Sequence, residues 1–254
     1  MYMPTRPSTD TLQLESFRVT LFKSTQRDPD VSLFASLLGQ SPIKSQIVNL
    51  PVKTIMSDGI VEGIRFTIED SMLVINIVFY GTDQVNPVDG TLLHPIGFDE
   101  SLEIVSRLWD KVQKMTDFFG TPRIAIAPVY FIPVEDKLVG YETISSYLPF
   151  VVNGQTASDF LFQINQPVEK MLPTGSKYVL NNVIQISVAV ISSVSVALAI
   201  TGLPTFLPKE VFRARLQFDA NNAPNSLLDK ASATAVYKES LASVMNVLQN
   251  GISL

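Results

Sequence analysis

Cysteine is absent from this 254-residue chain, and charged residues are scarce. The lack of cysteine excludes disulfides, thiolate nucleophiles and cysteine-ligated zinc or iron–sulfur centres. Charged residues make up 17% of the sequence, against about 25% in typical soluble domains, while 46% of the residues are hydrophobic. This much apolar surface has to be buried in a core or against another molecule. We therefore expect a large core and a protein–protein interface, with a homo-oligomer as the first hypothesis.

Basic residues are also few, and the formal net charge is −5. No Lys/Arg cluster offsets this balance, so we expect no nucleic-acid partner, because phosphate contacts need a basic surface. The opening sequence, MYMPTRPSTDTLQ, has no apolar segment after its charges and so lacks the pattern of a signal peptide. We interpret residues 1–11 as a flexible leader, residues 12–254 as a single domain and the protein as cytoplasmic.

The longest charge-free run lies between Lys177 and Lys209. Within it, Val183–Ile200 is long enough to raise the question of a membrane span. Almost every even-numbered residue there is a large aliphatic, whereas the odd-numbered residues are mostly small or polar. Sorting by parity is typical of a strand and has no purpose in a lipid-embedded helix. We therefore expect no membrane span here.

The length of this strand leaves two alternatives, since it exceeds most strands in globular proteins. It is either one long strand bent at Ser192-Ser193 or a hairpin that turns there, and the absence of Gly and Asn favours the bend. Either a helix of the same chain or another subunit covers the small face, with the helix as the commoner arrangement. If another subunit does so, the interaction residues are Ser187, Ala189, Ser193, Ser195 and Ala197.

The remaining pattern predicts an α+β fold with a largely antiparallel sheet of about seven to nine strands. The clearest element is a hairpin over residues 60–80, for which a two-residue turn at Asp70-Ser71 pairs Ile68 with Leu73. Two long amphipathic helices, over 98–119 and from Asn225 or Ser226 to Leu248, are expected to pack on one face of the sheet. The order of elements also allows two related halves, at about 12–132 and 133–254.

Residues 81–97 form a long polar loop that contains the only histidine, His94. Any triad or one-histidine metal site would have to use His94, and Asp83 and Asp89 in the same loop are the nearest candidate carboxylates. The spacing of these residues matches no ligand motif, so turn chemistry is favoured for them, as it is for Asp58-Gly59. Arg213 and Arg215 share one strand face, where ion pairs with acidic neighbours are favoured over an anionic ligand. No cofactor or metal is expected.

Three stretches together resemble an uncharacterised family of standalone bacterial α+β proteins of about this size. They are GIRFTIEDSMLVINIVFYG at 63–81, PRIAIAPVYFIP at 122–133, and FRARLQFDAN at 212–221 with the helix that follows. The resemblance implies the α+β fold but no activity.

The leading functional hypothesis is a non-enzymatic interaction or assembly protein that associates through an apolar strand or helix surface. A peptide- or client-binding module that uses a sheet edge or groove is the first alternative. A carboxylate-dependent hydrolase that uses the 81–97 loop is the second, and it requires Asp83, Asp89 and His94 to converge.

Overall fold

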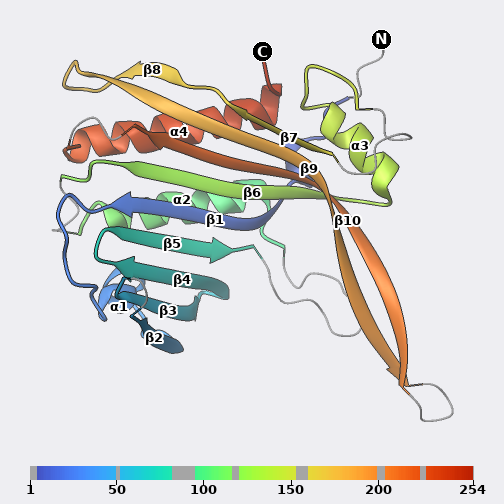
Figure 1. Cartoon of the computed structure of the whole chain (residues 1–254), viewed down its shortest axis with the longest axis horizontal. Coiled ribbons are helices and arrows are strands. Elements are labelled where there is room, and N and C mark those ends of the chain that lie inside the picture. The colour runs from blue at the N-terminus through green and yellow to red at the C-terminus, as the bar shows by residue number, and fades with distance from the viewer. Residues whose placement is uncertain are drawn as a thin grey trace.

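A single antiparallel sheet with helices on one face dominates the computed structural model (Figure 1). The structure describes residues 5–49, 52–81, 95–115, 120–152, 160–198, 204–223 and 227–253, and for 192–198 and 204–209 it describes the backbone alone. Ten strands pair in the order β2-β3-β4-β5-β1-β6-β10-β9-β7, with β8 also paired to β9. The strands are β1 (Gln13–Phe22), β2 (Lys44–Val48), β3 (Thr54–Val61), β4 (Ile64–Ser71), β5 (Val74–Tyr80), β6 (Ile124–Val134), β7 (Leu161–Asn165), β8 (Val168–Met171), β9 (Lys177–Leu198) and β10 (Pro204–Asn222).

The helices lie on the side of the sheet that carries the core. They are α1 (Leu33–Leu38), α2 (Phe98–Val112), α3 (Lys137–Ser145) and α4 (Lys230–Asn250), with a short 3-10 helix η1 at Thr9–Thr11. The long helices α2 and α4 run behind the strands in Figure 1, as the sequence predicts for the fold class. They meet where the rings of Trp109 and Tyr237 stack, with centroids 4.3 Å apart.

The alternation of apolar and polar residues along the central strands explains why the helices pack on this face. In β1, Phe17, Val19 and Leu21 are buried in the core shared with the helices, while Arg18 between them is exposed. In β10, Leu216 and Phe218 face the core in the same way. Successive side chains of a strand point to opposite faces, so each strand contributes every second residue to the core. None of the described helices forms a layer on the other face of the sheet.

The hairpin over residues 60–80 has the expected faces but not the expected pairing. β4 pairs with β5 so that Phe66 lies opposite Phe79 and Ile68 opposite Ile77, instead of Ile68 opposite Leu73. The turn falls at Met72-Leu73, where Ser71 Oγ accepts a hydrogen bond from the backbone N–H of Val74. Asp70 stays inside β4 because its carboxylate binds Lys23 and the backbone of Asp30. The predicted turn position is therefore wrong and Leu73 is exposed, although Phe66, Ile68, Ile77 and Phe79 form the buried face as expected.

Both long helices differ from the sequence-based boundaries. α2 ends at Val112, seven residues before Phe119, the predicted end; residues 116–119 are outside the described part of the chain. α4 begins after Asp229, whose side chain accepts a hydrogen bond from the backbone N–H of Ser232. Asp229, rather than Asn225 or Ser226, is thus the N-cap, a role that its short carboxylate side chain suits.

Residues 178–198 of the charge-free run lie in one continuous strand, β9, and residues 204–208 of the run belong to β10. β9 pairs with β10 from Asn222↔Leu180 to Pro204↔Leu198 without a shift in register, so no hairpin turn or bulge occurs at Ser192-Ser193. Of the two alternatives, the single long strand is confirmed. No helix among the described residues is long and apolar enough to cross a membrane.

Candidate functional site

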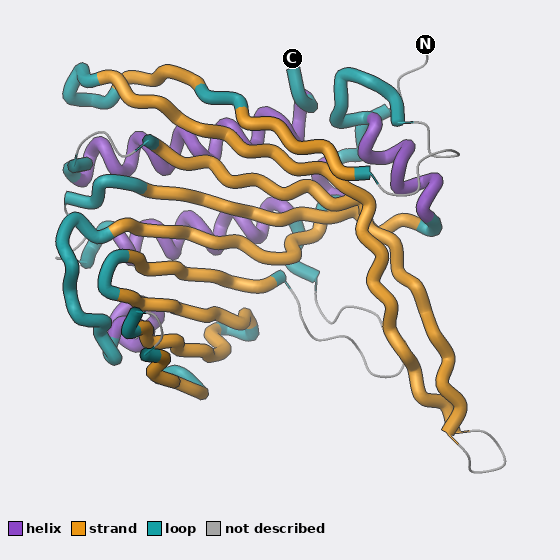
Figure 2. The backbone as a smooth tube through the Cα atoms, viewed as in Figure 1, coloured by secondary structure: helices purple, strands orange, loops and turns teal. Residues whose placement is uncertain are grey.

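The outer parts of β9 and β10 form a two-stranded ribbon that leaves the body of the sheet (Figure 2). The last pair between β10 and β6 is Phe212↔Val134, and the last pair between β7 and β9 is Leu161↔Ser187. Beyond these positions, residues 188–198 and 204–211 pair only with each other. We name this segment the arm. At about 3.3 Å per residue, it reaches roughly 30 Å from the body of the sheet.

The β9 strand of the arm is apolar where it leaves the sheet. Val190 and Ile191 are 45% and 40% exposed, and they point to opposite faces of the strand. No charged residue occurs between Lys177 and Lys209. Isolated two-stranded ribbons are only marginally stable in water, and exposed apolar strands with free edges favour pairing with other chains. Among the described surfaces, the arm is therefore the one that a bound partner would stabilise most.

The predicted interaction residues lie along the base and length of the arm. Ser187 and Ala189 are half-buried in β9, while Ser193, Ser195 and Ala197 have described backbone in β9 but their side chains are outside the described residues. The chain's own helices pack on the opposite, large face, where Ile184 and Ile186 are buried in the core. At Ser187 and Ala189 the described helices do not form the expected cover, because packing on the large aliphatic side chains buries more apolar area. At Ser193, Ser195 and Ala197 the expectation stays a prediction.

Helix α3 illustrates how closely the large face of β9 is packed. A Cβ atom at Gly140 would lie 2.9 Å from a γ-methyl carbon of Val188. Glycine at this position lets α3 approach β9 at the point where the arm begins. The helix thus packs against the root of the arm on the large face, and no described helix covers the face that carries Ser187 and Ala189.

A polar face lies next to the root of the arm. Arg215 donates two hydrogen bonds to the carboxylate of Glu15, both 2.9 Å long, so the ion pair predicted for this arginine is present. Arg213 instead lies over the ring of Phe131, with its guanidinium carbon 4.1 Å from the ring centroid. Burial lowers the pKa of Arg213 from its ordinary value, and Glu15 partly opposes this shift. The arginines are held by contacts within the chain, which favours a structural role for both.

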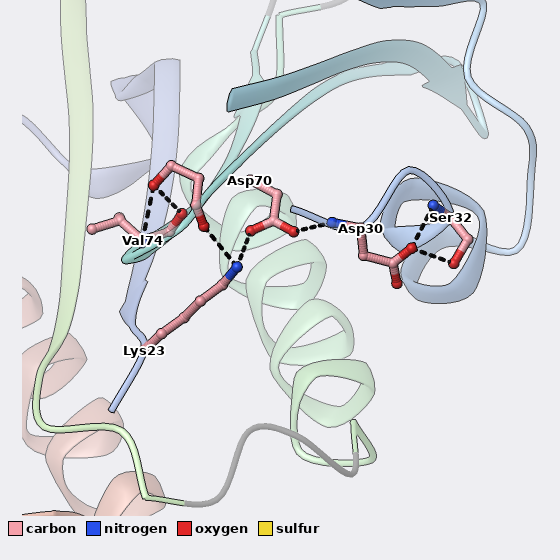
Figure 3. A network of polar contacts seen from close by, with 6 residues as sticks. Lys23, Asp30, Ser32, Asp70 and Val74 are labelled. Atoms are coloured by element: carbon pink, nitrogen blue, oxygen red, sulfur yellow. Dashed lines mark hydrogen bonds and ion pairs between the residues drawn. The ribbon is translucent and has the colours of Figure 1, made fainter. Parts of the chain in front are cut away.

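A second candidate site is a cavity of about 110 Å³ between β1, α1 and the β4–β5 turn. Figure 3 shows the polar network on its wall, in which the ammonium group of Lys23 lies 2.6 Å from Asp70 Oδ1. Lys23 also donates to the carbonyl of Ser71, and Asp70 Oδ2 accepts from the backbone N–H of Asp30. The volume is sufficient for a few water molecules but too small for most metabolites. Since these groups satisfy one another, we interpret the network as a structural link between β1, β4 and α1.

The loop residues proposed for catalysis cannot be placed. Asp83, Asp89 and His94 all lie outside the described residues, so their convergence stays a prediction. Within the described ranges, no group of three or more His, Cys, Asp or Glu side chains could hold a metal ion. Asp58 lies in strand β3, where it binds Arg65 and Thr67, so the turn role predicted for it is wrong.

Comparison with known proteins assigns no family. No protein-family model matches the chain, and no curated protein matches it significantly. The resemblance based on residues 63–81, 122–133 and 212–221 therefore stays a prediction, and the functional argument depends on the geometry of the arm.

Proposed function

We propose that this protein is an assembly protein whose copies associate with one another through the β9–β10 arm. The observation that carries the proposal is the arm itself, a ribbon without charge in β9 that extends beyond every other strand of the sheet. A ribbon with two open edges and exposed aliphatic residues gains stability only when a partner covers it. A second copy is the simplest partner, because most soluble oligomers are homo-oligomers.

The low charge of the chain supports the same proposal. Charged residues are depleted in the cores of protein interfaces, and charge-free surface of this length is uncommon on monomeric proteins. The net charge of −5 opposes the approach of two copies through their acidic surfaces. The β9 strand of the arm has no charged residue over 188–198, so two copies that meet along it do so where this repulsion is weakest.

Aspartate at the root of the arm should prevent assembly. In Val190→Asp and Ile191→Asp variants, a carboxylate would have to be buried without a partner, at a cost of about 3 kcal/mol or more, roughly a hundredfold in the dissociation constant. Light scattering coupled to size-exclusion chromatography should find an oligomer for the original chain and a smaller species for both variants at the same concentration.

A charge on an exposed apolar residue far from the arm provides the control. Val31, ahead of α1, is 67% exposed, so Val31→Asp should leave the oligomer intact. An original chain that is monomeric at concentrations of tens of micromolar would refute self-assembly. If Val31→Asp dissociates the oligomer to the same extent, then the net charge of the protein, and not the arm, governs association.

A further inference from the structure

The two edges of the arm differ in their ability to accept another strand. We infer that the outer edge of β9, over Val188–Leu198, pairs antiparallel with the same edge of a second copy around a twofold axis. This inference rests on the proposed assembly function and assigns its interface to one of the two edges. The positions of the prolines and charges carry it.

Proline positions establish which backbone groups point outward. Proline has no N–H, so it occupies positions where a strand does not need to donate to its neighbour. In β6, Pro133 lies opposite Arg213, which makes this a pair without mutual hydrogen bonds and turns the N–H and C=O of Arg213 toward β9. Because the register of β9 and β10 is unbroken, the N–H and C=O groups of the even-numbered residues of both strands point away from the ribbon along the arm.

The outer edge of β10 is poorly suited to pairing. Its outward positions on the arm are residues 204, 206, 208 and 210, and two of these are Pro204 and Pro208. Lys209 and Glu210 add charge to the same edge. Proline and charge are the usual means by which proteins prevent an edge from accepting another strand.

The outer edge of β9 has none of these protections. Its outward positions are Val188, Val190, Ser192, Val194, Val196 and Leu198, all of which have an N–H. No proline, lysine or acidic residue occurs in the strand beyond Lys177, and its register shows no bulge. One edge of the ribbon is thus closed to pairing and the other is open.

The sequence of β9 suits a second copy of itself. Two identical strands can pair antiparallel around a twofold axis that passes through one residue position. Even-numbered residues then lie opposite even-numbered residues, and odd-numbered residues lie opposite odd-numbered residues. Even-numbered large residues then meet large residues, and odd-numbered small residues meet small residues. The two β9 strands that meet then have one mainly aliphatic face and one mainly small-residue face, and neither carries a charged residue over 188–198.

A matched pair of proline substitutions tests the edge assignment. Val194→Pro removes one outward N–H from the β9 edge, whereas Phe206→Pro removes one from the β10 edge, and neither N–H points into the ribbon. Two equivalent hydrogen bonds are lost from a twofold pair, so Val194→Pro should raise the dissociation constant about 30-fold while Phe206→Pro leaves it unchanged. Sedimentation velocity over a concentration series measures both constants, and the thermal unfolding midpoint verifies that the body of the sheet is intact.

Single cysteines provide an independent readout, because the chain has no cysteine of its own. Cysteine placed in turn at each residue from 188 to 196 should form an intermolecular disulfide with itself only at the residue on the twofold axis, where the two Cα atoms are about 4.5–5.5 Å apart. Cysteine at residues 205–210 should form none.

The outcomes separate this inference from the proposed function. If the original chain is monomeric, both are refuted. If Phe206→Pro dissociates the oligomer and Val194→Pro does not, or if the two act equally or neither acts, assembly stands and the assignment to the β9 edge is overturned. Cross-linking from the β10 positions instead of the β9 positions would overturn it as well.

Discussion

Replacing Asp70 with alanine should lower the free energy of unfolding by about 3–5 kcal/mol, the range for removing one partner of a buried ion pair. The side chain of Asp70 is 4% exposed and that of Lys23 is 13% exposed, with 2.6 Å between the charged atoms. The substitution leaves the Lys23 ammonium group buried with only the carbonyl of Ser71 as a partner, and it leaves the backbone N–H of Asp30 without its acceptor. Urea denaturation at fixed protein concentration measures the change, since assembly also affects apparent stability.

An exposed ion pair in the same part of the sheet is the control. Asp58 and Arg65 form an ion pair of 3.1 Å, with side chains 37% and 42% exposed, so Asp58→Ala should cost about 1 kcal/mol or less. A double variant, Lys23→Met with Asp70→Leu, should recover the part of the loss that comes from the unpaired Lys23 charge, because apolar groups replace both charges. Equal costs for Asp70→Ala and Asp58→Ala would show that the Lys23–Asp70 pair does not contribute as a buried pair.

The faces of the strands could be predicted from the sequence, but the pairing between them could not. Parity along β4 and β5 is a local property, and it assigns Phe66 and Phe79 to the core correctly. The turn position depends on contacts that are distant in sequence, because Lys23 and Asp30 hold Asp70 within the strand. Nothing in residues 60–80 alone indicates that Asp70 has buried partners.

Glycine and proline also occur in strands of this fold at places that their local sequence does not indicate. Asp58-Gly59 has the composition of a turn, yet both residues lie in β3. Glycine suits this strand position because a Cβ atom there would be 2.7 Å from the ζ carbon of Phe34. Pro204 and Pro208 lie near the end of the charge-free run, and proline is a residue type that argues against a central strand. Both prolines lie in β10, at positions where the missing N–H faces away from β9. Because proline is tolerated mainly on the edge of a sheet, these two residues gave no local indication that β10 extends along the arm.

The sequence predicts the small-residue face of β9 because small residues recur at every second position. It does not predict which element packs against that face. Whether Ser187 and Ala189 face a helix depends on which side of the sheet the helices occupy, and that follows from the burial of all the strands together. The charge-free length was the signal that could have revealed the arm, since no body of this size needs a strand as long as β9 in its core.

Gly81→Ala should destabilise the protein by about 3 kcal/mol, the upper part of the range for overpacking. Gly81 follows β5 and donates its N–H to the carbonyl of Glu15, and a Cβ atom there would lie 1.7 Å from the carbonyl oxygen of Leu14. This neighbour is backbone and cannot rotate away. Leu14 is itself fully buried and donates to the carbonyl of Ile96, so relieving the clash requires β1 to separate from β5 or from Ile96.

Gly97→Ala is the matched control for this substitution. Gly97 precedes α2 with a backbone φ of −74°, and no atom lies within 4 Å of a Cβ built there. Alanine at this N-cap position should cost about 1 kcal/mol or less, because alanine is a poorer cap than glycine but meets no steric clash. If thermal and urea unfolding assign equal costs to Gly81→Ala and Gly97→Ala, then the close approach of β1 to Gly81 does not constrain the fold. A large cost for Gly81→Ala alone would establish that the backbone contact at the β1–β5 junction determines how the two strands end.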